Sequence, residues 1–123
     1  PESFAVLSGD DSVTLPLMAL GGRGVISVAS NEIPAEMARL ATLCLEGDLA
    51  RGRALHRRYL PLMEINFVES NPGPVKCALA LMGLIEPVYR LPMVPVQPAN
   101  RAKIEKVLES LGLLATVASE AAS

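Results

Sequence analysis

Two apolar segments near the start of the chain enclose one helix-sized segment. Residues 4–8 lead into Gly9, and residues 24–28 follow the pair Gly21-Gly22. Because continuous apolar runs are typical of parallel strands covered on both faces, this order predicts a parallel βαβ unit. Two strands cannot close a barrel, since closure needs tilt and shear over about eight strands. We therefore expect this unit to belong to a larger α/β architecture.

The remainder of the chain is predicted to be mostly helical. Helices are expected over residues 14–20, about 31–46, about 49–67, 72–82 and 100–111, with an extended, proline-containing segment over 84–98. Thr14 and Asn71 are the expected N-caps of two of these helices, and Pro61 is expected to bend a third. We divide the chain into residues 1–48, which hold the βα units, and 49–123, a helical region with a frayed tail from 115.

The composition limits the classes of function. Half of the 123 residues are apolar, aromatic residues are 3% of the chain, and the mean hydropathy is +0.36. The net charge of -2 gives no general attraction to nucleic acid or to anionic membranes. No apolar run reaches the roughly 18 residues of a membrane span. With no signal peptide recognised, we expect a cytoplasmic protein that binds neither nucleic acid nor membrane.

Cysteine and histidine do not form a metal-binding pattern. Cys44 and Cys77 fall on different predicted helices without metal-ligand spacing, so buried, reduced thiols are expected. His56 is the only histidine and lies among arginines, which predicts a solvated or salt-bridged helix face rather than a phosphate site. We expect no metal and no cofactor.

Two acidic residues follow the first strand. Asp10 and Asp11 have the composition of a paired-carboxylate acid–base site. Helix capping and interaction with the helix dipole explain carboxylates at this position better. We therefore predict a structural role for both.

Four motifs in a fixed order resemble the dihydrodipicolinate synthase family. They are residues 7–11, 17–28, 69–76 and 90–93. The strand at 25–28 and the motif at 71–76 favour this family over the related N-acetylneuraminate lyases. The resemblance covers about residues 4–114. It implies a (β/α)₈ barrel of which this chain supplies the seventh and eighth βα units and the helical C-terminal region.

The resemblance also implies a chemistry. The family condenses pyruvate with L-aspartate 4-semialdehyde in lysine (diaminopimelate) biosynthesis, through a Schiff base to a lysine at the end of the sixth strand. By this resemblance, that lysine lies outside the sequence. Lys76, Lys103 and Lys106 are the only lysines, and none is expected at a strand end. We therefore expect no catalytic residue in this chain, which is predicted to be inactive by itself.

Two substrate-binding positions can be carried over from the resemblance. Ile26 matches the residue whose backbone lines the pyruvate pocket. Gly9 matches a position where the backbone approaches the second substrate, although a tight turn that needs unusual dihedral angles is an alternative explanation for Gly9. Both roles belong to the backbone, so they do not depend on reactive side chains.

Two other functions stay open at this point. The chain is alternatively a non-catalytic helical self-assembly module, or part of another pyruvate-dependent aldolase of the same superfamily. Its high apolar content predicts exposed apolar surface and hence partners. We expect a homo-oligomer with contacts through the C-terminal helices, or association with an N-terminal barrel portion.

Overall fold

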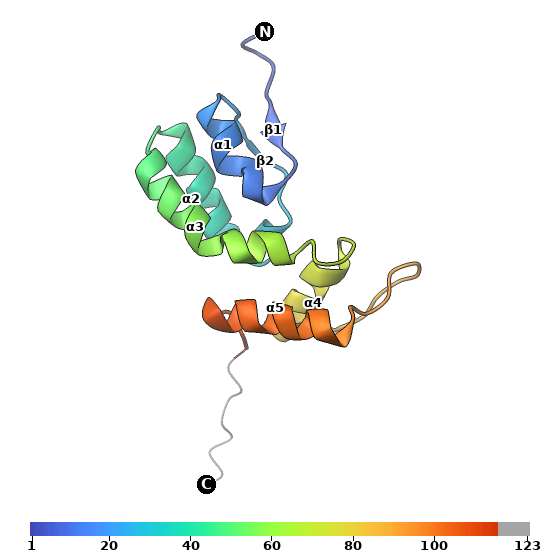
Figure 1. Ribbon diagram of the computed structural model, residues 1–123. Helices are drawn as coiled ribbons and strands as arrows, with labels where there is room; N and C mark the ends of the chain where they lie inside the picture. The colour runs from blue at the N-terminus through green and yellow to red at the C-terminus, as the bar shows by residue number, and fades with distance from the viewer. Residues whose placement is uncertain (116–123) are drawn as a thin grey trace.

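The computed structural model describes residues 1–115, and the predicted fraying beyond residue 115 lies outside this part. Seven helices and strands follow one another along it: β1 (Leu7–Ser8), α1 (Thr14–Ala19), β2 (Gly24–Val25), α2 (Pro34–Leu45), α3 (Leu49–Ile65), α4 (Gly73–Leu81) and α5 (Pro98–Ser110). Two short 3₁₀ helices, η1 (Asp11–Val13) and η2 (Ala29–Asn31), follow the strands. In Figure 1, β1, β2 and α1 to α3 form one part of the molecule, and α4 and α5 lie below it.

The two strands pair in parallel, as predicted. Leu7 lies opposite Gly24 and Ser8 opposite Val25, and α1 connects the strands as the crossover. Each strand is only two residues long, although the apolar runs predicted about five. In the described residues each strand has one partner, so ladder hydrogen bonds form along one edge of each. The apolar runs mark strands that need further neighbours.

The start of α1 differs from the prediction. Thr14 is the first residue of the helix rather than its N-cap, because η1 begins the helical turn three residues earlier. Asp10 caps η1, since its carboxylate accepts a hydrogen bond of 2.9 Å from the backbone N–H of Ser12. Capping by Asp10 was expected, and it moves the helical turn toward the N-terminus.

α2 and α3 pack side by side and cover α1. Gly47 joins them with a φ of +79°, a left-handed conformation that glycine adopts at no steric cost. Asp48 then caps α3 by accepting from the backbone N–H of Arg51 at 3.1 Å. Pro61 lies inside α3, and Figure 1 shows the helix changing direction along its length.

α4 begins one residue later than predicted. Pro72 is its N-cap position and Gly73 its first residue, and the Asn71–Pro72 peptide bond is cis. Asn71 therefore does not cap the helix, because Pro72 occupies the N-cap position. The buried face of α4 includes Val75, Cys77 and Ala78, consistent with the predicted apolar helix.

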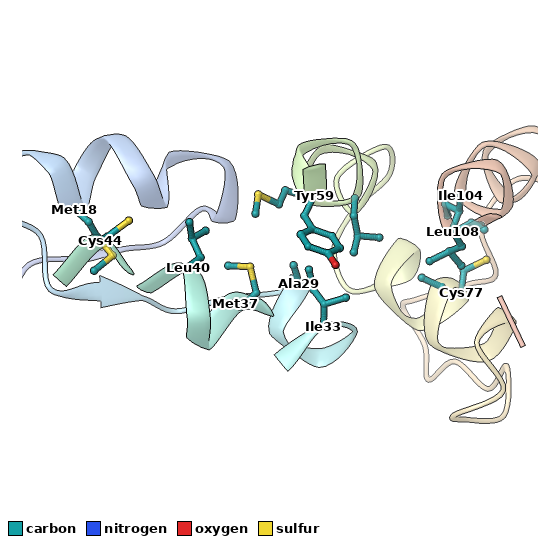
Figure 2. Packing of buried hydrophobic residues seen from close by; sticks show 14 residues of the cluster. Met18, Ala29, Ile33, Met37, Leu40, Cys44, Tyr59, Cys77, Ile104 and Leu108 are labelled. Carbon is teal, nitrogen blue, oxygen red and sulfur yellow. The ribbon is translucent and has the colours of Figure 1, made fainter. Parts of the chain in front are cut away.

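One continuous core connects all the helices. Figure 2 shows Met37, Ala29 and Tyr59 near its centre, with Ile104 and Leu108 at the end formed by α5. Ile104 and Leu108 are fully buried. Because aromatic residues are scarce, aliphatic side chains, methionine and cysteine fill most of this space, together with the ring of Tyr59.

Both cysteines are buried free thiols, as expected. Burial raises the pKa of Cys44 and Cys77, which keeps both thiols neutral and poorly nucleophilic. Within residues 1–115, no helix is long and apolar enough to cross a membrane.

Candidate functional site

The C-terminal ends of β1 and β2 lie next to each other. The backbone N–H of Ile26, directly after β2, donates a hydrogen bond of 2.8 Å to the carbonyl of Ser8, the last residue of β1. Gly9 follows Ser8, so Gly9 and Ile26 start the two segments that leave the strand ends. In parallel α/β folds, ligands bind at this edge. The structure thus brings the two predicted substrate-binding positions together.

A single buried carboxylate joins the two segments. Asp11 is 1% exposed and lies in η1 after β1. Its Oδ2 accepts hydrogen bonds from the backbone N–H groups of Val28 (3.0 Å) and Ala29 (2.8 Å), which follow β2. Its Oδ1 accepts a hydrogen bond from the hydroxyl of Ser27. We call residues 26–33 the second strand-end loop, and Asp11 fixes its first half.

The two neighbouring carboxylates therefore do different things. Asp10 is exposed and bonds only within its own turn, to the backbone and hydroxyl of Ser12. Asp11 reaches across to the next βα unit. Neither shares a proton-transfer site with the other, so the structural interpretation fits the geometry and the acid–base interpretation does not. The sequence analysis predicted a structural role for both residues. It did not predict the hydrogen-bond partners of Asp11, which are 16 to 18 positions away.

The surroundings of Gly9 and Ile26 differ from those of the core. The Ile26 side chain is 70% exposed, although it belongs to an apolar run. Gly9 is exposed, its φ is not in the left-handed region, and a Cβ placed there would meet no atom of the described residues within 4 Å. A left-handed turn therefore does not explain why residue 9 is a glycine. The space in front of both residues is open in this part of the chain.

The lysines lie on the C-terminal helices. Lys76 on α4 has its Nζ 5.1 Å from the ring centre of Tyr89, a cation–π contact. Lys103 and Lys106 are exposed on α5. His56 on α3 is half-buried rather than solvated, and its Nδ1 has no hydrogen-bond partner. Residues 1–115 hold no cluster of metal-ligating side chains.

The parallel βα units, followed by a helical region, define the C-terminal part of a (β/α)₈-barrel protein. A family model described as the dihydrodipicolinate synthetase family matches residues 1–111. The chain belongs to this family.

Relatives of known name agree with this assignment. The chain is 58% identical over 120 residues to 4-hydroxy-tetrahydrodipicolinate synthase of Koribacter versatilis, covering 96% of this chain and 40% of the relative. It is 56% identical over 114 residues to the synthase of Acidobacterium capsulatum, covering 93% and 38%. The crystal structure of dihydrodipicolinate synthase from Aquifex aeolicus superimposes with a TM-score of 0.91 at 46% identity, over 94% of this chain and 40% of that chain. The chain thus spans about two-fifths of the length of these relatives.

Proposed function

We propose that this chain is the C-terminal part of a lyase that condenses pyruvate with L-aspartate 4-semialdehyde in lysine biosynthesis. The observation that carries the proposal is the match of almost the whole chain to the same two-fifths of several synthases, at up to 58% identity. The pairing of the two strand ends at Gly9 and Ile26 supports it, because barrel enzymes bind substrates at this edge.

The proposed reaction uses a Schiff base between pyruvate and a lysine supplied by the remaining barrel. An imine withdraws electrons from the pyruvate methyl group, so a proton can leave and the resulting carbon nucleophile can attack the aldehyde. The three lysines of this chain lie on α4 and α5, and none lies on the segments that directly follow β1 and β2. The chain by itself is therefore proposed to be inactive, and no cofactor is needed for this chemistry.

The proposed contributions of this chain are backbone contacts. Ile26 would present its backbone to pyruvate, and Gly9 would let the second substrate approach the main chain. The exposure of both residues supports these roles, because nothing in the described residues covers them. Asp11 would act through the second strand-end loop, by fixing the residues that follow Ile26.

The proposed organisation follows from this function. Residues 1–48 would complete the barrel, and residues 49–123 would form the helical region. We propose a cytoplasmic homo-oligomer, or association with an N-terminal barrel portion. Exposed apolar side chains support association: Leu20 is 88% exposed, and Leu91, on the segment between α4 and α5, is 86% exposed. Sedimentation at micromolar concentration tests this, and a stable monomer contradicts it.

Complementation tests the catalytic proposal. The N-terminal three-fifths of the Koribacter versatilis synthase, which this chain does not match, is co-expressed with the chain and the complex is purified. Pyruvate and borohydride should leave a reduced adduct on the N-terminal partner and none on this chain. Condensing activity should appear only when both parts are present. An adduct on Lys76 contradicts the proposal, as does a complex that forms and traps no pyruvate.

Two alternatives predict other outcomes. A non-catalytic assembly module would form a defined oligomer by itself and would not associate with the barrel portion. A different pyruvate-dependent aldolase would trap pyruvate in the complex but accept an aldehyde other than aspartate semialdehyde. The pairing of strand ends and the identity to named synthases favour the synthase.

A further inference from the structure

A second buried polar contact ties the same loop to the helical region. Glu32 lies just after η2 and is 5% exposed, and Asn66, which follows α3, is fully buried. The side-chain Nδ2 of Asn66 donates a hydrogen bond of 2.7 Å to Oε2 of Glu32. The contact joins residues 34 positions apart. It therefore holds the second half of the second strand-end loop, whereas Asp11 holds the first half.

Two oxygens at this contact lack a donor. Oε1 of Glu32 and Oδ1 of Asn66 are both buried and have no hydrogen-bond partner. In the ionised form of Glu32 both atoms can only accept, so the pair is short of one proton. A neutral carboxylic acid at Glu32 gains an O–H donor, for which Oδ1 of Asn66 is the acceptor without a partner. The balance of donors and acceptors at this contact therefore favours the protonated acid.

The charges around Glu32 agree with this. The ion pairs in the described part of the chain, Asp48–Arg51 and Arg101–Glu105, do not involve Glu32. Burial raises the pKa of Glu32 to about 7; the hydrogen bond from Asn66 opposes this shift and the charge of Asp11 on η1 adds to it.

Other elements next to the loop also carry ionisable groups. From α3, the Tyr59 side chain reaches toward Ala29 and Ile33, as Figure 2 shows. α4 carries Lys76, which lies over the Tyr89 ring, and Cys77, which Figure 2 shows beside Ile104 and Leu108. On α2, Glu36 and Arg39 line a separate groove against α3. Asp11 is thus the charge among them that acts on Glu32.

We propose that Glu32 is a positioning residue for the second strand-end loop, which begins at Ile26: as a neutral acid bonded to Asn66, it holds this loop against α3, and its ionisation loosens the loop. The consequence for pyruvate rests on the proposed function, because it needs the backbone of Ile26 to line the substrate pocket. The loosening of the loop does not rest on it.

Hydrogen–deuterium exchange of the 123-residue chain measures the loop directly. The reporters are backbone N–H groups with defined acceptors in the loop: Ala29 to Asp11, and both Glu32 and Ile33 to the carbonyl of Ala29. After correction for the intrinsic effect of pH on exchange, their protection should fall on the order of tenfold or more between about pH 5 and about pH 8. Protection that stays constant over this range overturns the proposal.

Two variants identify the group responsible. Glu32→Gln keeps the size and both hydrogen-bonding atoms of the neutral acid but cannot ionise, so its protection should be nearly independent of pH. Glu64→Gln removes an exposed carboxylate from the helix that precedes Asn66 and should behave as the unmodified chain. A pH dependence that persists in Glu32→Gln assigns the effect to another group and overturns the proposal.

A spectroscopic titration and a kinetic comparison complete the test. With ¹³C-labelled glutamate, one carboxyl signal should titrate near pH 7, and Glu32→Gln should lack it; its presence in the variant overturns the proposal. In the complex with the N-terminal portion, KM for pyruvate should rise several-fold above pH 7, with kcat changed less, and Glu32→Gln should remove this rise. A complex without activity contradicts the proposed function, while the exchange data still decide the role of Glu32.

Discussion

The backbone N–H of Ala29 donates a hydrogen bond of 2.8 Å to the Asp11 carboxylate, 18 positions earlier in the chain. This contact connects the ends of two parallel strands without any strand residue taking part. Since Asp11 also accepts from Val28 and from the hydroxyl of Ser27, one side chain satisfies three donors of the second strand-end loop. Asp11 therefore fixes the residues that directly follow Ile26.

Asp11→Ala should destabilise the fold strongly. The substitution leaves the N–H groups of Val28 and Ala29 without their acceptor, and an unsatisfied buried donor costs about 1–3 kcal/mol. The free energy of unfolding in urea should fall by about 2–4 kcal/mol. Asp10→Ala is the matched control, because it removes only the exposed cap of η1 and should cost about 1 kcal/mol. Equal losses in the two variants would contradict the bridging role of Asp11.

The stability of the chain should fall as the pH rises through the titration of Glu32. Burial raises its pKa in the folded state to about 7 from 4.5. The folded state therefore holds this proton more tightly than the unfolded state does. The contribution of this proton to the free energy of unfolding is complete below about pH 4.5. It is lost progressively as pH rises and is gone above about pH 7, a total of about 3 kcal/mol.

Urea unfolding at a series of pH values checks this prediction. Glu32→Gln should flatten the dependence between about pH 4.5 and about pH 7, because an amide does not ionise. The assignment would be contradicted if the stability of the unmodified chain did not fall over this window. It would also be contradicted if the unmodified chain and Glu32→Gln showed the same dependence on pH.

Truncation of a core residue on α5 should destabilise the whole chain. Ile104 is fully buried in the core that connects α3, α4 and α5. Ile104→Ala removes buried methyl groups and leaves a cavity, so the free energy of unfolding should fall by about 2–5 kcal/mol. Lys103→Ala, at an exposed neighbouring position, should change it by less than about 0.5 kcal/mol. Thermal unfolding by circular dichroism distinguishes the two; a small effect of Ile104→Ala would mean that α5 folds separately from the rest.

Gly52 marks a close approach between α3 and its neighbours. A Cβ at this buried position would lie 3.3 Å from Cδ1 of Leu15 and 3.5 Å from Sγ of Cys44. Gly52→Ala should stay within about 1 kcal/mol of the unmodified chain, because the higher helix propensity of alanine offsets a small shift of Leu15. Gly52→Leu should cost about 1–3 kcal/mol, since the added atoms cannot be placed without moving the helices. Denaturation midpoints that fall equally for both variants would contradict this.

The helical region was predictable because its signals are local. Gly47, Gly83 and Gly112 stop helices in the structure at the places where the sequence indicates, each with a positive φ. The capping of α3 by Asp48 likewise depends on residues within one turn. The order strand–helix–strand was also predictable, because it follows from apolar runs and the turns between them.

The departures from prediction have more than one physical cause. The strands are two residues long because a strand extends only as far as it has partners. Thr14 is not an N-cap, because the 3₁₀ helix η1, which Asp10 caps, begins the helical turn before it. Asn71 is not the N-cap of α4, because the helix begins at Gly73 and Pro72 occupies the N-cap position.

The sequence by itself determined the family, the order of the elements and the positions of Gly9 and Ile26 at two strand ends, because motifs and periodicity are properties of the linear chain. Only the tertiary structure decided what holds those strand ends in place. Folding brings the donor groups of the second strand-end loop to Asp11, and it brings Asn66 to Glu32. The physical reason is that a buried polar side chain must be satisfied by whatever groups the packing brings to it, and their positions cannot be read from local sequence.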